Sequence, residues 1–151
     1  IIIATSNAAS EFVREEIGKG AVVDKKFQTM LLNFLQEKGI FKPELLNRFD
    51  AIVVFKPLTQ NAIKQIVNML LTTFTKNLLE KDITVTFDDR VIAKIIAEGF
   101  DKDFGARPLR RFIQDNIEDL VAQQMLKDEI KRGDSIIVTV GVSDNIEVNK
   151  N

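Results

Sequence analysis

The sequence predicts a helix-rich, mixed α/β protein built from two parts. Several stretches carry apolar residues at the three-, four- and seven-residue spacing of amphipathic helices, and short runs of branched residues between them are typical of strands. A turn at Pro57-Leu58-Thr59 marks the boundary that we expect between the parts. Of the 151 residues, 45% are hydrophobic and 28% are charged, so the chain can bury a core.

Two apolar runs predict strands in the first part. Residues 1–4, Ile-Ile-Ile-Ala, are typical of a strand buried on both faces in a parallel sheet, and residues 51–55, Ala-Ile-Val-Val-Phe, form a second run. A buried strand at the first residue, with no methionine or leader before it, favours a chain cut from a longer protein. Such a strand also has no partner in its own neighbourhood, which supports the same expectation.

Three helices are predicted between these strands. The first is a short helix that Ser10 could cap and that Gly18 could end. The stretch from Asp24 to Lys38 predicts an amphipathic helix, with Gly39 just after its end. Another short helix begins at Pro43 and leads into the second strand.

The second part begins with a long helix that Thr59 is placed to cap. Its apolar stripe comprises Ile63, Ile66, Val67, Leu70, Leu71, Phe74 and Leu78. Strands are predicted at residues 83–87, 134–140 and 145–148, and we expect them to pair as a small sheet. Between the first two of these strands, one helix runs from Asp88 to Gly99 and another begins at Pro108.

Composition excludes several classes of chemistry. The chain has no Cys and no His, which removes disulfides, thiolate and imidazole metal sites, and a histidine general base. The net charge of −1 gives no overall field toward nucleic acid or lipid, so an anion site has to be local. We expect no metal site, no nucleic-acid partner and no membrane segment, and a cytoplasmic location.

The segment "GARPLRR", residues 105–111, places three arginines at the start of a helix. Arg107, Arg110 and Arg111 oppose the helix macrodipole there, and Arg107 with Arg111 is a like-charge pair at i,i+4. Under one interpretation, Asp101, Asp103 and Asp115 neutralise a solvated helix start. Under the other, an external phosphate completes the site, bound by guanidinium groups and backbone N–H groups, with Gly105 allowing close approach.

Two more polar residues are candidates for phosphate chemistry. Asn7 follows the first predicted strand, where ligands bind in open α/β sheets, although Ser6 and Asn7 also suit a simple turn. Arg48 ends the short helix that starts at Pro43. It either stabilises that helix end, paired with Asp50 or Glu44, or projects a guanidinium toward a phosphate on a neighbouring subunit.

Three segments resemble a known family. The segment "TSN" after an apolar strand, "FKPELLNRFDAIVVFKPL", and "GFDKDFGARPLRRFIQDNIEDLVAQQML" are similar to the C-terminal ATPase module of the Clp family of AAA+ protein unfoldases and disaggregases, of the ClpB or ClpC type. The resemblance implies that residues 1–57 are the C-terminal part of the large α/β subdomain. It implies that residues 58–151 are the small C-terminal lid subdomain, with helices and a three-stranded sheet.

The resemblance also implies roles for the candidate residues. Asn7 matches sensor 1, which positions the attacking water, and Arg48 matches the arginine finger, which reaches the nucleotide of the adjacent subunit. Arg107 matches sensor 2, which contacts the phosphates of its own subunit's nucleotide, while Arg110 and Arg111 are helpers in the same motif. The implied cofactor is ATP or ADP with Mg²⁺, and the implied partners are the other subunits of a homohexameric ring and unfolded or aggregated client proteins.

The sequence lacks the GxxxxGK[ST] phosphate loop and the acidic strand end that hold phosphates and Mg²⁺. We therefore expect this chain alone to bind nucleotide weakly and to be inactive as an ATPase. Some relatives dock a Clp peptidase through an apolar-Gly-apolar tripeptide; Ile17-Gly18-Lys19 departs from that pattern, and we interpret it as a helix stop. Protease-associated and disaggregase types thus both stay open, and a non-catalytic oligomerisation or protein-binding module is the alternative function.

Overall fold

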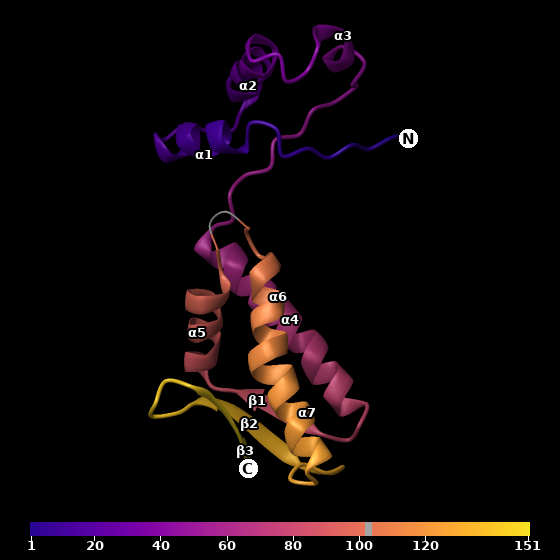
Figure 1. Ribbon diagram of the computed structural model, residues 1–151, viewed down its shortest axis with the longest axis vertical. Helices are drawn as coiled ribbons and strands as arrows, with labels where there is room; N and C mark the ends of the chain where they lie inside the picture. Colours follow the sequence, from indigo (N-terminus) through magenta and orange to yellow (C-terminus); the bar gives the residue numbers. More distant parts are fainter. Residues whose placement is uncertain (102–103) are drawn as a thin grey trace. The chain divides into compact units, whose positions relative to one another are not determined.

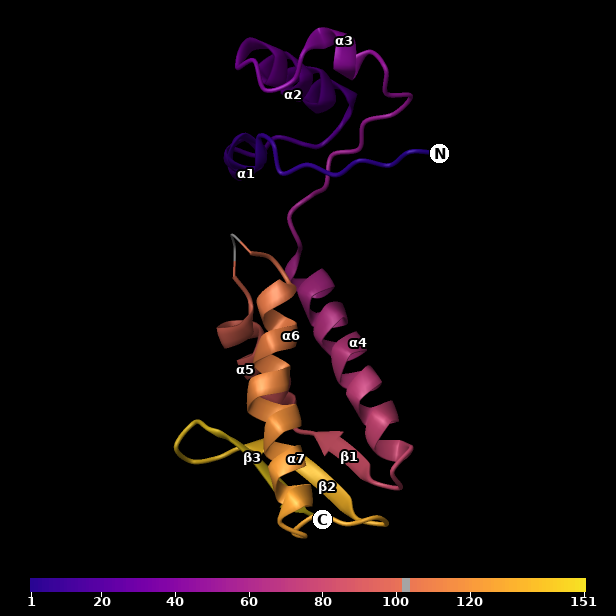
Figure 2. The same ribbon diagram turned by 45° about the vertical axis from the view of Figure 1, so that its right-hand side comes forward.

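The computed structural model describes residues 1–101 and 104–151, and it divides the chain into two compact units. The first unit is Ile1–Pro57 and the second is Leu58–Asn151. Figures 1 and 2 show the helices and strands of each unit.

The first unit contains three helices: α1 (Ser10–Gly18), α2 (Lys25–Glu37) and α3 (Pro43–Leu46). The helix predicted from Asp24 to Lys38 is confirmed as α2, and the Asp24 side chain caps it by accepting a hydrogen bond of 2.9 Å from the N–H of Phe27. Gly39 follows the helix with a φ of 64°, which a residue with a side chain rarely adopts. The expected cap at Ser10 is wrong, because the chain enters α1 through Ala9 in a left-handed conformation and Ser10 already lies in the helix.

The first unit has a small apolar core. Phe27, Leu31 and Leu35 are buried along one face of α2, as the helical spacing predicts, and Leu46 of α3 is also buried. Phe12 of α1 stacks on Phe34 of α2, with ring centroids 4.2 Å apart. This contact joins α1 to α2.

The strands expected at residues 1–4 and 51–55 do not form, so that part of the fold prediction is wrong for this chain. The side chains of Val53 and Phe55 are 73% and 82% exposed, and the carbonyl of Ile52 accepts a hydrogen bond from the Gln28 side chain. A strand needs a neighbouring strand to bond its backbone N–H and C=O groups. Within the residues that the structure describes, neither segment has such a partner.

The second unit has the helix-rich α/β fold that the sequence predicts, with a small mixed sheet. Its elements follow one another as α4 (Gln60–Leu79), β1 (Thr84–Phe87), α5 (Asp89–Gly99), α6 (Arg107–Ile113), a π-helical turn η1 (Gln114–Glu118), α7 (Asp119–Leu126), β2 (Ser135–Val140) and β3 (Ile146–Lys150). The predicted cap at Thr59 is confirmed, since its side chain accepts the N–H of Ala62. Asp88, where the second helix was expected to begin, caps α5 by accepting the N–H of Arg90.

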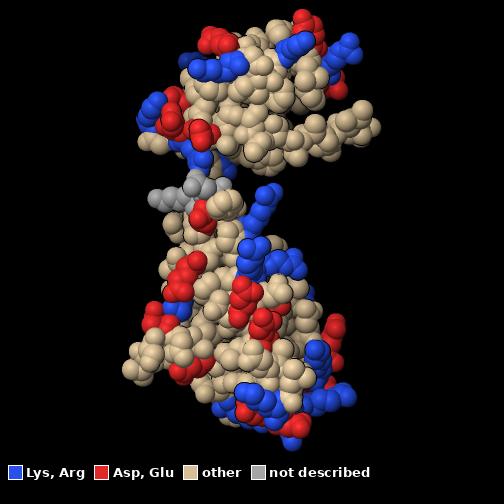
Figure 3. All heavy atoms as spheres, viewed as in Figure 1, with Lys and Arg blue, Asp and Glu red and all other residues tan. Residues whose placement is uncertain are grey.

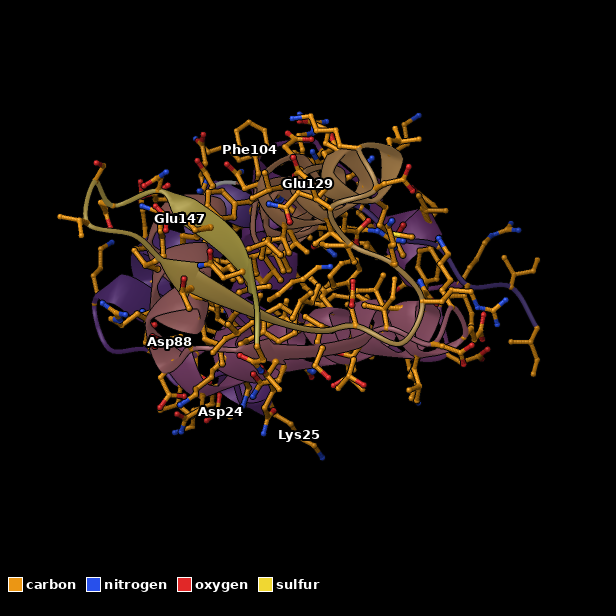
Figure 4. The ribbon with its side chains drawn as sticks, turned by 90° about the horizontal axis from the view of Figure 1, so that it is seen from below. Asp24, Lys25, Asp88, Phe104, Glu129 and Glu147 are labelled. Atoms are coloured by element: carbon orange, nitrogen blue, oxygen red, sulfur yellow. The ribbon has the colours of Figure 1, made fainter. Side chains whose placement is uncertain are left out.

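The three strands form one sheet in the order β1-β2-β3. Strand β1 runs parallel to β2, with Val85 opposite Ile136, and β3 runs antiparallel to β2, with Val148 opposite Val138. The side chains of these four residues are buried, whereas Thr84, Thr86 and Glu147 are exposed. Figure 4 views the sheet from its outer side, with the helices behind it and Glu147 labelled on β3.

The core of the second unit lies between this sheet and the helices. Helix α4 contacts α5 and β1, and α5 contacts α6 and β2. The following core side chains are at most 2% exposed: Ile63, Val67, Val91, Ile95, Leu109, Ile113, Ile117, Val121, Ile136 and Val138. The buried Leu109 and Ile113 therefore hold α6 against α5, and they lie on the same helix as the three arginines.

Helices α6 and α7 and the π turn between them form one continuous rod (Figures 1 and 2). Within the rod, the N–H of Asp119 donates to the carbonyl of Gln114, five residues back, which is the hydrogen bond of a π-helix. The carboxamide of Asn116 donates to the carbonyl of Phe112 at 3.0 Å. The sequence predicts one helix starting at Pro108, and the structure confirms its position, but the π turn was not predicted.

Candidate functional site

The connection into α6 is held by Asp101. The carbonyl of Asp101 accepts the N–H of Gly105 at 2.8 Å, and its carboxylate accepts the N–H of Phe104 at 3.0 Å. Gly105 has a φ of 68°, a conformation that residues with a side chain rarely adopt, which accounts for a glycine at this position. The Phe104 side chain is 69% exposed, and Figure 4 shows it pointing away from the body of the unit.

The three arginines of the motif lie at the start of α6 with exposed side chains. Arg107 is the first residue of the helix, and Arg110 and Arg111 follow one turn later. Leu109 and Ile113 of the same helix are buried, which anchors the turn that carries the arginines. Figure 3 shows basic side chains gathered over this helix start.

No ion pair between described residues involves Arg107, Arg110 or Arg111. Neutralisation by Asp115, which was part of one of the two interpretations, is therefore not observed, and Asp103 lies outside the described residues. Repulsion among three guanidinium groups and the positive end of the helix both disfavour this arrangement. A bound phosphate would relieve both effects, because guanidinium groups and helix N–H groups are phosphate donors.

Asn7 lies in the first unit, in the segment before α1, and is exposed. Its carbonyl accepts the N–H of Ser10 at 3.2 Å, and the hydroxyl of Ser6 accepts the N–H of Ala8 at 3.0 Å. Both bonds turn the chain into α1, as expected if Ser6 and Asn7 form a turn. A role of the Asn7 carboxamide toward a phosphate stays a prediction.

Arg48 lies in the turn just after α3 and is exposed. Its N–H donates to the carbonyl of Leu45 at 3.0 Å, which places it on the last turn of this short helix. Among the residues that the structure describes, Arg48 forms no ion pair with Asp50 or Glu44. Its guanidinium is thus available to an external anion.

Gly105, Arg107, Arg110 and Arg111 come together at one helix start, whereas Asn7 and Arg48 lie on separate segments of the other unit. The site with a defined local geometry is therefore the group of four in the second unit.

Lys94 on α5, whose side chain is only 12% exposed, was not among the residues predicted from the sequence. Its ammonium group pairs with Glu98 of the same helix and lies 2.9 Å from the carboxylate of Asp144. These hydrogen bonds, first that to Glu98 and then that to Asp144, raise the pKa of Lys94. The i,i+4 spacing of Lys94 and Glu98 was a signal in the sequence, but the contact with Asp144, 50 residues away, was not.

An open polar pocket lies beside this ion-pair group, lined among others by Lys94, Glu98, Asp115, Asn116 and Asp144. Three carboxylates face it, and the lysine is already paired with two of them. Such a pocket repels phosphate, so the start of α6 is the better candidate for a nucleotide contact.

Within residues 1–101 and 104–151, no cluster of three or more carboxylates is arranged to hold a metal ion. In the same residues, no helix combines the length and apolar character needed to cross a lipid bilayer.

Residues 58–138 match the family model described as the C-terminal, D2-small domain of ClpB protein. The chain is 38% identical over 136 residues to the chaperone protein ClpB of Oceanobacillus iheyensis, covering 87% of this chain and 17% of that protein. It is 36% identical over 155 residues to the chloroplastic chaperone protein ClpC1 of Arabidopsis thaliana, covering 98% of this chain and 17% of that protein. A chloroplastic protein of Solanum lycopersicum, named as an ATP-dependent Clp protease ATP-binding subunit and ClpA homolog, has the same identity and coverage.

The chain thus spans about a sixth of the length of these relatives, 17% in each case. The matched residues include the start of α6 with its three arginines and the whole α4–α5–α6 core. The chain therefore belongs to the Clp family of ClpB and ClpC chaperones, and residues 58–138 form its D2-small domain.

Proposed function

We propose that this chain is the nucleotide-sensing and ring-assembly part of an ATP-driven Clp protein unfoldase or disaggregase. In this proposal, residues 1–57 are the C-terminal part of the large AAA+ subdomain, and residues 58–151 are its small lid. Arg107 acts as sensor 2 on the phosphates of its own subunit's nucleotide, with Arg110 and Arg111 as helpers. Gly105 gives the backbone before Arg107 the conformation that the turn requires.

The observation that carries the proposal is the uncompensated charge at the start of α6. Arg107, Arg110 and Arg111 are exposed, and no described carboxylate pairs with them. A protein gains no stability from such a group by itself, because Arg107 in the first turn opposes the helix macrodipole by about 0.3–1 kcal/mol and the guanidinium groups repel one another. The three arginines are therefore better explained by binding of a polyphosphate than by a contribution to folding stability.

The same proposal assigns Arg48 as the arginine finger and Asn7 as sensor 1. Arg48 would place a guanidinium on the phosphates held by a neighbouring subunit, which stabilises charge during phosphoryl transfer by about 10³–10⁵ in rate. Asn7 would hold the attacking water by its carboxamide. Both assignments are supported by exposure and by position in the Clp segments, not by contacts in this chain.

The described residues fit the phosphates of ATP or ADP better than they fit Mg²⁺. Guanidinium donors are present at α6, whereas the described carboxylates form no cluster of three or more for a metal ion. We infer that this chain supplies anion contacts, and that the metal ligands and the phosphate loop come from another segment of a Clp ATPase. When bound, the nucleotide supplies the phosphoryl transfer, and the residues of this chain bind and orient its phosphates.

The proposal includes partners and location. We propose a homohexameric ring of such subunits acting on unfolded or aggregated proteins in the cytoplasm. The names of the relatives include both chaperones and an ATP-binding subunit of a Clp protease, so a Clp peptidase is proposed as a partner only for the protease-associated type.

Replacing Arg107 by alanine in a complete Clp ATPase that carries this chain tests the central assignment. We expect a higher KM for ATP, while circular dichroism and thermal unfolding stay close to those of the unmodified protein, because Arg107 is exposed. The replacement of Arg132, an exposed arginine after α7, is a matched control that should leave the KM unchanged. An unchanged KM in the Arg107→Ala protein would refute the sensor role.

Mixed rings test Arg48. Subunits with Arg48→Ala are combined with subunits that lack the phosphate-loop lysine, and ATP hydrolysis is compared with that of each variant alone. If the finger acts across a subunit boundary, two inactive variants regain activity in the mixture. If the Arg48→Ala protein alone keeps full ATPase activity, Arg48 is not an arginine finger and only stabilises the end of its helix.

The isolated 151-residue chain provides a separate test. We expect no ATP hydrolysis above background, because the chain lacks the GxxxxGK[ST] loop that holds the phosphates. Turnover in a pure preparation, resistant to further chromatography, would contradict this expectation.

The second candidate function is a non-catalytic oligomerisation or protein-binding module. The large exposed apolar side chains of the second unit favour it, including Met69, Leu126 and Val142. A complete gene without an upstream phosphate loop would decide for this module, and a gene with one would decide for the ATPase.

A further inference from the structure

Gly99, the last residue of α5, lies directly against α6. A Cβ atom built on Gly99 would lie 3.0 Å from the Cβ of Phe112, 3.2 Å from a terminal methyl of Leu109 and 3.3 Å from the Cα of Leu109. Two of these three atoms are fixed to the backbone of α6, so a side chain at position 99 cannot be accommodated by rotating a flexible group. The helix itself has to move by a few tenths of an ångström.

The residues that Gly99 touches belong to the turn that carries the arginines. Leu109 and Phe112 flank Arg110 and Arg111 in the sequence, and Leu109 lies two residues after Arg107. Leu109 is fully buried, so the turn is fixed to the core at this point and is exposed only on its arginine side. The contact with Gly99 therefore sets how far the arginine-bearing turn stands from α5.

The connection between the two helices strengthens this link. Helix α5 ends at Gly99 and α6 begins at Arg107, and Asp101 bonds to both Phe104 and Gly105 along the way. A side chain at position 99 would push on Leu109, which lies within one helical turn of Arg107, so Arg107 would move with it.

We propose that Gly99 is a positioning residue for Arg107: the absence of a side chain at this point lets α6 lie close enough to α5 to place the guanidinium groups for phosphate contact. This inference rests on the proposed function of Arg107 as a phosphate sensor. Gly99 itself touches no phosphate; it acts through the position of α6.

A double-mutant cycle in a complete Clp ATPase that carries this chain tests the proposal. The proteins are the unmodified one, Gly99→Ala, Arg107→Ala and the double variant, and the readouts are KM for ATP and kcat. We expect Gly99→Ala to raise the KM about 3- to 10-fold, because displacing a binding group by a fraction of an ångström weakens its contacts. The double variant should be no worse than Arg107→Ala alone, because the two changes remove one interaction.

A purely structural role of Gly99 gives a different result. Misfolding would lower the active fraction, and therefore kcat, without raising the KM. The matched control is Gly18→Ala: Gly18 also ends a helix, its φ is ordinary, and an added Cβ there would meet no atom within 4 Å. We expect this variant to have the KM and kcat of the unmodified protein.

We expect the Gly99→Ala protein to fold, since alanine is the better helix former and none of the three contacts falls below 3.0 Å. If it does not fold, Leu109→Met reshapes the same contact from the α6 side while conserving volume. It should then show the same rise in KM and the same lack of additivity with Arg107→Ala.

The outcomes separate the two proposals. If Arg107→Ala leaves the nucleotide response unchanged, the proposed function fails. If Arg107→Ala raises the KM but Gly99→Ala and Leu109→Met do not, or if their effects multiply with that of Arg107→Ala, the positioning role of Gly99 is overturned and the sensor role stands.

Discussion

Asp88 serves two purposes at the start of α5, next to the sheet (Figure 4). One carboxylate oxygen accepts the N–H of Arg90 at 2.9 Å, which caps the helix, and the other accepts two bonds from the Arg90 guanidinium, at 2.9 and 3.1 Å. The side-chain bond from Arg90, and next the backbone bond, lower the pKa of Asp88. Asp134 has a lowered pKa in the same way, first through Lys150 and then through the N–H of Lys131.

A lowered carboxylate pKa gives the stability of the second unit a defined pH dependence. The contribution is fully present above the ordinary pKa of an aspartate, about 3.9, and is lost as the pH falls through the lower pKa of the folded state. We expect the thermal midpoint of the chain to fall between about pH 5 and pH 2 in part because Asp88 and Asp134 become protonated.

Asp88→Asn should flatten this dependence. Asparagine caps a helix as well as aspartate does, so α5 keeps its start while the titrating charge is lost. Thermal midpoints measured from neutral to acid pH should fall less for the variant than for the unmodified chain. Asp89→Asn removes the same charge one residue away and keeps the Asp88–Arg90 pair; an equal flattening in this control would contradict the assignment.

Individual residues differed in how well the sequence revealed them. The caps at Asp24, Thr59 and Asp88 were predictable, because each precedes an apolar helical stripe by the usual spacing. Ser10 was mispredicted because the left-handed Ala9, not a side chain, starts α1. The roles of Asn7, Arg48 and Arg107 stay predictions, since a functional contact needs a ligand or neighbour that this chain does not include.

At the level of elements, the π turn explains an unusual spacing in the rod formed by α6, η1 and α7. Leu109, Ile113, Ile117 and Val121 are all buried, and each lies four residues after the one before. In a regular α-helix a four-residue step overshoots one turn by about 40°, so this row would drift by about 120° from Leu109 to Val121. The wider π turn absorbs the drift and keeps all four residues facing the core.

Deleting one residue from the π turn should therefore be tolerated. Without Asn116, the intervals between the four buried residues become four, three and four residues. A regular α-helix keeps residues at these intervals on one face. We expect the thermal midpoint of this deletion variant to stay within a few degrees of that of the unmodified chain. The lost bond from Asn116 to the carbonyl of Phe112 costs about 0.5–1.5 kcal/mol, since the contact is a single neutral hydrogen bond.

The matched control is deletion of Thr72, an exposed residue in the middle of the regular helix α4. That deletion rotates the following core residues, Phe74 and Leu78, by about 100° and should unfold the second unit. Equal damage from the two deletions would show that the π turn is not a one-residue insertion.

Ile117 in the middle of the π turn should be as sensitive as any core residue. It is fully buried, so Ile117→Ala is expected to lower the free energy of unfolding by about 2–5 kcal/mol, as measured with urea. The exposed Glu118 beside it should tolerate alanine within about 0.5 kcal/mol. A small effect at Ile117 would mean that this part of the rod is not packed.

Long amphipathic helices were thus predictable from spacing, but the π turn was not recognised. Its signal was present, since four apolar residues at intervals of four disagree with the period of 3.6. The close contact of Gly99 with α6 could not be predicted in this way. A glycine at this position is also what a helix end requires, so the sequence does not distinguish the two roles.

For the whole molecule, the two units differ in how much apolar surface they bury. The core of the second unit includes residues from every helix and strand between α4 and β3. The buried side chains described for the first unit are Phe27, Leu31, Leu35 and Leu46, from two helices. The first unit should therefore be the less stable of the two.

Native hydrogen exchange should reveal this difference. We expect the amides of α2 to exchange faster than those of α4, because opening α2 exposes less buried apolar surface. Mass spectrometry of peptides from residues 25–37 and 60–79 measures both in one experiment. Equal protection of the two helices would contradict the difference in stability.

The sequence predicted the helices of both units and the strands of the second unit, but its two strands in the first unit were wrong, for one physical reason. Helices satisfy their backbone hydrogen bonds within a single segment, so spacing alone identifies them. Strands need partners, and the apolar runs at residues 1–4 and 51–55 find none among the described residues, while β1, β2 and β3 find one another.

The pairing of β1 with β2 also bears on the order in which the chain becomes folded during synthesis. Thr86 of β1 bonds to Ile136 of β2, 50 residues later in the chain. Strand β1 therefore leaves the ribosome well before its neighbour has been made, and α5 and the α6–α7 rod emerge in the interval. The helices can associate first, but the sheet that closes the core must wait for residues 135–150. A nascent chain halted before these residues therefore has a second unit with an incomplete core and exposed apolar side chains.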